Sequence, residues 1–323
     1  MSTRELPTFG LFPILSYKKD ELAETGCHVA AYNFSTSNMD MASRTHAVNS
    51  IASICYETKN KVDSASLYTK LAAESGGLPS SSFEFISVLF TEQEVELIKN
   101  KRKANCINIL NIERHGEWVE ENDKKYLITN YRAVVYDVEN NLSRIWQTLP
   151  EEDIRNRFNT KEECDIIFRH TYVFKLTIDS ATRVQLLRHR RMSPQERSRR
   201  YVSAKRVPFT FYVSEDMKDI KSIQKFKDVN GNEVEIELGI KDVNNLCQEH
   251  YFQCLEQGVK AQSARRAIPQ GMNTDIWVKF DREGYKNFIE LRTDSHAQTE
   301  IRELANHMLG FSRHILELQA KSN

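Results

Sequence analysis

Residues 185–201 constrain the fold most strongly, because they hold six arginines and one histidine within seventeen positions. The chain as a whole has no net charge, with 45 lysines and arginines against 45 aspartates and glutamates. Cationic side chains gathered this densely need either water or an anionic partner. A guanidinium offers a planar fork that matches two phosphate oxygens. The segment therefore predicts either a phosphate-binding pocket or a solvated basic surface.

Features within and around this segment favour the pocket. Gln185 and Leu186 precede the charges, Tyr201 follows them, and Glu196 interrupts them. A protein dedicated to duplex DNA usually carries a basic surplus, which this chain lacks. We therefore expect a small phosphate ester as the partner and no nucleic acid. A nucleic-acid- or protein-binding module that uses residues 188–206 as a basic arm is the alternative from another class.

Composition and hydropathy narrow the class of protein further. Hydrophobic residues make up 40% and charged residues 28%, which is typical of a soluble globular protein. No apolar run approaches the roughly 18 residues that cross a bilayer, and residues 1–16 lack the pattern of a secretory signal. The six cysteines include no Cys-x-x-Cys pair, so we expect reduced thiols and no zinc site. These features predict a cytoplasmic protein with no membrane partner and no metal.

Apolar periodicity predicts an α+β fold. Helices are predicted over residues 40–76, 180–190, 242–267 and 281–321, and strands over 83–90, 171–178, 208–213 and 233–240. Residues 91–170 alternate charged turns with short β-like pieces at 107–112 and 125–129, and are predicted as a hairpin-bearing insertion. We expect a single catalytic domain over residues 1–323, in which long helices flank an antiparallel or mixed sheet.

Two further polar clusters lie downstream. If residues 290–300 are helical, Arg292 and His296 lie four residues apart on one face. An arginine directed at a heterocycle stabilises negative charge that develops on the ring. An exposed helix with satisfied ion pairs explains this pattern equally well. The other cluster, Arg265 and Arg266 shortly before Pro269, is weak by itself. Neither a Gly-x-Gly-x-x-Gly turn nor a P-loop is present, so any redox cofactor is held by other means.

Taken together, these clusters resemble the flavin-dependent thymidylate synthase family. Its signature is Arg-His-Arg, seven residues and then Ser, which Arg188-His189-Arg190 and Ser198 match. Glu196 and Arg200-Tyr201 stand at the family's spacing around the serine. Downstream, Ala264-Arg265 before Ile268-Pro269 and the stretch from Asn287 to Ile301 are similar to two further family motifs.

The resemblance implies a homotetramer that binds FAD where subunits meet. It implies reductive methylation of dUMP to dTMP, with methylenetetrahydrofolate as carbon donor and NADPH as electron source. The residues implied to contact dUMP are Gln185, Arg188, Glu196, Ser198, Arg199, Arg200, Arg265 and Arg292, with Arg292 as the catalytic residue. Those implied to contact FAD are Ser81, Arg188, His189, Arg190, Glu196, Asn287 and His296, and Tyr201 lies toward the folate.

The sequence departs from the family pattern at two places. The family has His-x-Thr/Ser-x-Phe-Glu-His where this chain has residues 79–85, which keep Ser81 and Phe83-Glu84 but neither histidine. Asp281-Arg282-Glu283 replaces Asn-x-Arg and reverses the charge at its last position. These departures leave open a variant C5 chemistry, namely hydroxymethylation, or UMP or a cytosine nucleotide as the substrate.

Overall fold

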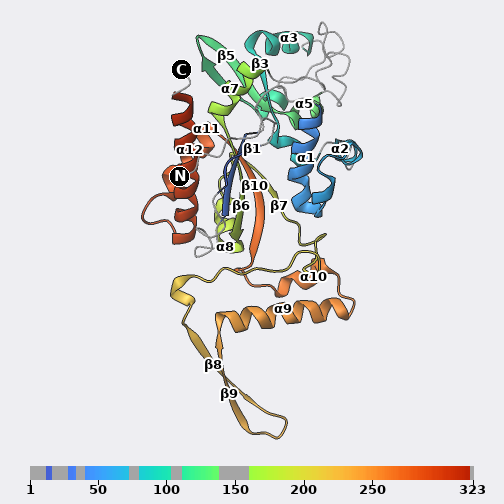
Figure 1. The fold of residues 1–323 in the computed structure, drawn as a ribbon, viewed down its shortest axis with the longest axis vertical. Helices are drawn as coiled ribbons and strands as arrows, with labels where there is room; N and C mark the ends of the chain where they lie inside the picture. Colours follow the sequence, from blue (N-terminus) through green and yellow to red (C-terminus); the bar gives the residue numbers. More distant parts are fainter. Residues whose placement is uncertain are drawn as a thin grey trace.

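The computed structural model describes residues 12–16, 28–33, 41–72, 80–102, 111–137 and 160–320. In this part of the chain, helices pack around two sheets and a third, two-stranded sheet projects from the body, and the strands of all three pair antiparallel (Figure 1). The longest helices have 22, 17 and 16 residues. The α+β fold class with long flanking helices is therefore confirmed.

The elements of the first half are β1 (Phe12–Ser16), β2 (His28–Asn33), α1 (Met41–Tyr56), η1 (Lys59–Lys61), α2 (Ala65–Ala72), η2 (Ser81–Phe85), β3 (Ser87–Thr91), α3 (Glu92–Arg102), α4 (Asn111–Arg114), β4 (Glu117–Glu121), β5 (Lys124–Asn130) and α5 (Tyr131–Asp137), where η denotes a 3₁₀ helix. Those of the second half are α7 (Lys161–His170), β6 (Thr171–Asp179), α8 (Ser180–Leu186), β7 (Met192–Glu196), η6 (Glu215–Met217), β8 (Lys221–Lys227), β9 (Glu233–Gly239), α9 (Ile240–Glu256), α10 (Ala261–Ala264), η7 (Arg265–Ala267), β10 (Asn273–Asp281), α11 (Arg282–Arg292) and α12 (Thr299–Ala320).

The central sheet has the strand order β1-β2-β6-β10-β7. Strands β6 and β10 pair over their whole length, from Asn273 opposite Asp179 to Asp281 opposite Thr171. Alternate residues of these strands are apolar, so one face of the sheet is buried. That face packs against α11 and α12, which lie on one side of the sheet in Figure 1, and the buried side chains include Phe174, Leu176, Ile276, Val278, Phe280, Phe288, Ile301, Leu304 and Phe311.

The opposite face of the central sheet adjoins a second core. Buried side chains of α1, η2 and the β3-β5-β4 sheet pack together there, and Trp277 of β10 and Val173 of β6 join them. Parts of the predicted insertion, such as Leu127 and Tyr131, belong to the same cluster. Residues 111–134 are thus packed against the rest of the chain, whereas the single domain with an insertion at 91–170 stays a prediction.

A two-stranded ribbon, β8–β9, projects from the body below α9 (Figure 1). Residues 228–232 connect the strands, and Gly231 adopts a φ of 84° there. One face of the ribbon is mostly apolar, with Phe226 opposite Val234, and with Ile236 and Leu238 opposite Gln224 and Ser222. The other face is charged, and Lys221 pairs with Glu237 at 3.3 Å and Lys225 with Glu235 at 2.5 Å. The predicted strand at 233–240 is confirmed as β9, and its partner β8 was not predicted.

Several predicted elements agree with the structure. The strand at 171–178 is β6, the piece at 125–129 lies in β5, and the stretch 281–321 forms two helices, α11 and α12. The stretch 40–76 contains α1 and α2 within its described residues. The stretch 242–267 is helical up to Glu256, and the chain then breaks at Gly258, which has a φ of 84°. Among these elements, α2, α11 and α12 have a clear apolar face, and such a face is the pattern that a sequence predicts best.

Other predictions were wrong. Residues 81–85 form the 3₁₀ helix η2, so only the second half of the predicted strand at 83–90 is β-structure. The predicted helix at 180–190 ends at Leu186, and residues 192–196 form β7. β7 is an edge strand, where Pro194 is tolerated. Residues 208–213 contribute only one bridge, from Phe211 to Met272, and within 107–112 the described residues begin the helix α4.

Gly284 lies where α11 packs closely against the segment before β7. A Cβ atom at Gly284 would lie 2.5 Å from the carbonyl oxygen of Arg191, and the Gly284 amide also donates to the Asp281 carboxylate at 2.6 Å. Gly284→Ala is therefore expected to lower the free energy of unfolding by about 1–3 kcal/mol, measured by urea denaturation. Gly310→Ala is the matched control, because a Cβ there meets no atom within 4 Å and alanine favours a helix. Equal stability of the two variants would contradict the expectation.

Candidate functional site

The first helix turn after β6 fixes the position of the site. The Asp179 carboxylate accepts hydrogen bonds from the Ala181 amide at 2.8 Å and the Thr182 amide at 3.0 Å, and so caps α8. Because β6 is paired on both sides in the central sheet, the start of α8 is held firmly. Arg183 and Gln185 follow within two turns, and both side chains remain partly exposed.

Glu196, a predicted site residue, lies at the end of β7 and accepts hydrogen bonds from two other elements. Arg183 of α8 donates to both carboxylate oxygens, at 2.8 and 3.1 Å, and the Thr274 hydroxyl of β10 donates at 3.3 Å. These bonds fix the orientation of the Glu196 carboxylate, and Arg183 compensates its negative charge. Arg183 was not predicted, although its place two residues before Gln185 on the same helix was a usable signal.

His189 and Arg292 meet across 103 positions of sequence. The Arg292 Nε donates to the His189 Nε2 at 3.0 Å, and the His189 ring packs edge-on against Phe288 with centroids 5.0 Å apart. Burial, and then the positive charge of Arg292, lower the pKa of His189. The imidazole is thus neutral near pH 7, which lets its Nε2 act as the acceptor. Among the described residues, the remaining N–H groups of Arg292 have no hydrogen-bond partner, so they can serve a bound ligand.

The segment between α11 and α12 also reaches the site. Gln185 donates to the side-chain oxygen of Gln298, which joins α8 to this segment. The expectation that Arg292 and His296 share a helix face was wrong, because α11 ends at Arg292 and Thr293 caps it. The His296 side chain is 94% exposed and hydrogen-bonds to Asp294 at 2.8 Å.

The second half of the basic segment is divided between interior and surface. Arg199 is 7% exposed, donates to the Val207 carbonyl at 2.8 Å and lies over the Phe209 ring. The Arg199 guanidinium therefore already has contacts with other residues of the chain, namely the Val207 carbonyl and the Phe209 ring. Arg200 and Tyr201 are exposed, and the Arg200 guanidinium lies 5.2 Å from the Tyr201 ring centroid.

The other predicted site residues are placed as follows. Arg188, Arg190, Arg265 and Asn287 are exposed, Ser198 is partly exposed, and the Ser81 hydroxyl donates to Gln195 of β7. The chain thus places Glu196 against α8 through Arg183, Gln185 of α8 against Gln298, and His189, three residues after α8, against Arg292. Within the described residues, no hydrogen bond or ion pair joins Arg200 or Arg265 to that group. The roles assigned to all these residues remain predictions.

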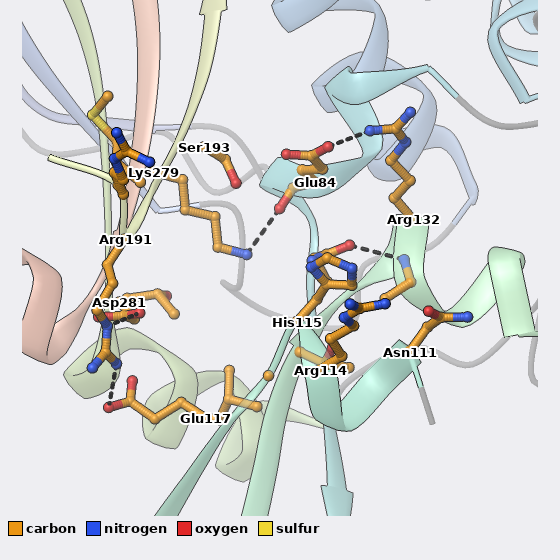
Figure 2. A pocket seen from close by; sticks show the side chains of 18 residues that line it. Glu84, Asn111, Arg114, His115, Glu117, Arg132, Arg191, Ser193, Lys279 and Asp281 are labelled. Atoms are coloured by element: carbon orange, nitrogen blue, oxygen red, sulfur yellow. Dashed lines mark hydrogen bonds and ion pairs between the residues drawn. The ribbon is translucent and has the colours of Figure 1, made fainter. Parts of the chain in front are cut away.

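A cavity of about 1030 Å³ lies between the β3-β5-β4 sheet with α4 and the edge of the central sheet (Figure 2). Of the predicted residues, Arg190 lines it. Lys279 of β10 enters it and donates to the Glu84 carbonyl at 3.0 Å. Burial lowers the pKa of Lys279 to about 7. Lys279 was not predicted, although a lone charge within the apolar strand stretch Ile276–Phe280 was a visible signal.

Some kinds of site have no support in the described part of the chain. The described residues include no group of three or more histidines, cysteines, aspartates or glutamates placed to bind a metal ion. None of the described helices combines the length and the apolar character of a membrane span.

Comparison with known proteins gives a consistent result. Residues 119–316 match the family model described as thymidylate synthase complementing protein. Among curated relatives named flavin-dependent thymidylate synthase, that of Pyrococcus furiosus is 32% identical over 142 residues, covering 42% of this chain and 52% of the relative. The relative from Sulfurisphaera tokodaii is 31% identical over 173 residues, which cover 49% of this chain and 61% of the relative. The relative from Aquifex aeolicus is 34% identical over 148 residues, which cover 44% of this chain and 44% of the relative.

The chain spans about half the length of the curated relatives that it matches. Among solved structures, a UMP/dUMP methylase, PolB from Streptomyces cacaoi bound with 5-Br dUMP, matches with a TM-score of 0.34 and 21% sequence identity. This match covers 51% of this chain and 80% of the other.

Proposed function

Since the chain belongs to the family of flavin-dependent thymidylate synthases, we propose that it is a methyltransferase that converts dUMP to dTMP by reductive methylation. In this proposal FAD is the cofactor, and methylenetetrahydrofolate and NADPH are co-substrates. The enzyme acts in the cytoplasm as a homotetramer. The observation that carries the proposal is the contact between the Arg292 guanidinium and the neutral His189 imidazole.

Arg292 is the proposed catalytic residue. Its Nε is occupied by His189, so the direction of the guanidinium is fixed and its other N–H groups point away from that bond. A cation held in this way stabilises negative charge that develops on a pyrimidine ring, which raises the reactivity of C5. His189 acts as a positioning residue, because a neutral imidazole accepts from the arginine without competing for the ligand.

Glu196 and Gln185 have the proposed task of orienting the pyrimidine. The Glu196 carboxylate is held by Arg183 and Thr274, and a carboxylate oriented in this way can accept an N–H of the base. The Gln185 side chain is held by Gln298, and its amide offers both a donor and an acceptor. These two polar groups, one on α8 and one held against it, would thereby determine how the base lies relative to Arg292.

The residues proposed to hold FAD fit an anionic dinucleotide. Arg190 opens into the cavity that also contains Lys279 and Arg114, a cationic set that suits the phosphate groups. When bound, FAD would supply the reducing equivalents for the transferred carbon. Asp281, which stands where the family has Asn, caps α11 and pairs with Arg191 at 3.0 Å. Its negative charge is therefore compensated within the chain.

The nucleotide phosphate has the proposed ligands Ser198, Arg200 and Arg265. Because Arg200 and Arg265 share no contact with the α8 group within the described residues, the proposal places them beside Arg292 of a neighbouring protomer. This arrangement requires sites between subunits, as in the proposed homotetramer. Tyr201 remains exposed for the folate.

The activity is tested by incubating the reduced protein with methylenetetrahydrofolate and, separately, with dUMP, UMP or dCMP. Mass spectrometry then identifies the nucleotide that is modified and distinguishes a methyl from a hydroxymethyl product. Purified protein is expected to be yellow and to release FAD on heating. Colourless protein that binds DNA with a steep salt dependence would contradict the proposal.

Arg200→Ala and Arg265→Ala are expected to weaken dUMP binding about tenfold or more, because each removes a charge-assisted hydrogen bond to phosphate. Deoxyuridine, which lacks the phosphate, should lose much less affinity in both variants. The measurement is a pair of binding isotherms, one for each ligand. Arg266→Ala is the control, because Arg266 is also exposed and lies beside Arg265 on η7. Equal losses for the two ligands would count against a phosphate contact.

A further inference from the structure

The strand β7, which carries Glu196, is held by more than its pairing in the sheet. β7 is the last strand of the central sheet, and Glu196 at its end lies opposite Ile276 of β10. The helices α1 and η2 also contact β7 (Figure 1). The sequence of β7 includes Pro194 and has low β-propensity, so pairing with β10 alone would hold it weakly. Contacts from α1 and η2 are therefore expected to fix the position of this strand.

The Cys55 thiol of α1 supplies a hydrogen bond at the outer edge of β7. The Arg197 amide donates to the Asp275 carbonyl of β10 at 2.9 Å, so the Glu196 carbonyl in the same planar trans peptide points away from β10. That carbonyl accepts a hydrogen bond from the Cys55 Sγ at 2.9 Å. The thiol thus satisfies a backbone acceptor that faces away from the sheet.

The direction of two further hydrogen bonds follows from the first. A carbonyl oxygen only accepts, so the Cys55 S–H donates to Glu196 and the sulfur lone pairs remain for a donor. The Gln195 side-chain amide donates to that sulfur at 3.0 Å, and its oxygen accepts from the Ser81 hydroxyl of η2. Gln195 is 7% exposed, so these partners hold its amide largely away from water.

This chain of hydrogen bonds joins two residues that have proposed roles in binding. Ser81 is proposed to contact FAD, and Glu196 is proposed to orient the pyrimidine. Arg183 and Thr274 hold the Glu196 carboxylate, and the Cys55 bond holds the backbone from which that carboxylate extends. A small displacement of this backbone would move the carboxylate relative to a bound base, and the rate of a reaction depends strongly on such placement.

We infer that Cys55 and Gln195 are positioning residues for the proposed reaction, and that they act through Glu196 rather than on the substrate. The inference rests on the proposed function for the reaction, whereas the hydrogen-bond network rests on the geometry. Cys55 lies 141 positions before Glu196 in the sequence, so the signature around Ser198 gives no sign of its role.

The first test is the kinetics of dTMP formation by the FAD-loaded enzyme, with rates expressed per bound FAD. Cys55→Ala removes a partner from the Glu196 carbonyl and from the Gln195 amide, so kcat should fall about tenfold. The KM for dUMP should change less than about threefold, because the proposed phosphate ligands supply most of the affinity. Cys55→Ser keeps a donor and an acceptor at this position and should stay within about threefold of the wild type.

A double-mutant cycle separates positioning from a general structural role. In a Glu196→Gln background, Cys55→Ala should lower kcat by less than about threefold, because the carboxylate that it positions is absent. Gln195→Leu removes both side-chain bonds at similar volume, so it should lower kcat about as much as Cys55→Ala and add little to it. Cys247→Ala is the matched control, because Cys247 is a partly exposed free thiol on α9, and its kcat should equal that of the wild type.

An infrared measurement reports on the network independently of activity. The difference between the wild-type and Cys55→Ser spectra isolates the S–H stretching band of Cys55, which donation to a carbonyl shifts to lower frequency. The shifted band is expected in the wild type, and Gln195→Leu should alter its frequency, because the sulfur then loses its donor.

Three results would overturn the inference. They are an S–H band at the frequency of an unbonded thiol, wild-type kinetics in Cys55→Ala, and a loss of kcat that is equally large in the Glu196→Gln background. Failure of the proposed function is distinguishable, because protein that forms no dTMP but shows the shifted band retains the network. Protein that forms dTMP and has an unbonded Cys55 thiol refutes the inference alone.

Discussion

Arg292→Ala is expected to lower the rate of dTMP formation by a factor on the order of 10²–10³, the usual cost of removing a donor that stabilises charge in the transition state. The bound FAD should remain, because Arg292 is proposed to contact the pyrimidine and is not among the residues proposed to contact FAD. The single-turnover rate and the ratio of FAD absorbance to protein absorbance measure the two quantities separately. A large loss of rate with normal flavin content is the expected combination.

Two variants sharpen this test. Arg292→Lys keeps a positive charge but lacks the fork that contacts His189 and the ligand together, so it should recover only part of the rate. Lys286→Ala removes an exposed cation from the same helix and should leave the rate unchanged. Turnover of Arg292→Ala within a few-fold of the wild type would refute the catalytic role.

Asp275→Ala is expected to lower the free energy of unfolding by about 3 kcal/mol, because it leaves a buried arginine without its nearest counter-charge. The Arg197 side chain is 6% exposed and donates to Asp275, while its other carboxylate neighbour, Glu57, lies 3.7 Å away. Asp275 also accepts from the Thr177 hydroxyl at 2.7 Å. Urea denaturation followed by circular dichroism measures the change.

The control for this variant is Asp165→Ala, at an exposed position on α7, which should change the free energy of unfolding by less than about 0.5 kcal/mol. A second variant, Arg197→Met, removes the buried charge together with the need for its partner. It should destabilise the protein less than Asp275→Ala does. If Asp275→Ala were as stable as the control, the pair would have no structural role.

The sequence predicted best the elements whose burial follows a regular period. Strand β6 has apolar residues at every second position from Tyr172 to Ile178, and α11 and α12 carry an apolar stripe, so the pattern of the sequence was sufficient to predict them. Strand β7 was not predicted, because its sequence Met-Ser-Pro-Gln-Glu has neither apolar alternation nor high β-propensity. Pairing with β10 holds it in place, and that information belongs to the partner strand.

The candidate site was predictable only in part, for a related reason. The spacing of the signature identified His189 and the downstream motif identified Arg292, but their contact arises from the packing of α11 against the central sheet. Within the basic segment, Arg197 and Arg199 are buried, whereas Arg188, Arg190 and Arg200 are exposed. An arginine has the same appearance in a sequence whether it serves the fold or a ligand. Only burial and the identity of its partners separate the two.

The β8–β9 ribbon is expected to unfold locally before the rest of the molecule. Two strands alone are marginally stable in water, and the side chains of Ile236 and Phe226 on its apolar face remain 42% and 46% exposed. Fraying of this ribbon costs little free energy and leaves the hydrophobic core clusters intact, because none of them includes a residue of β8 or β9. Its amide protons should therefore exchange with solvent long before those of β6 and β10. Changes of length at residues 228–232 would be tolerated for the same reason, so the ribbon can vary independently of the rest of the molecule.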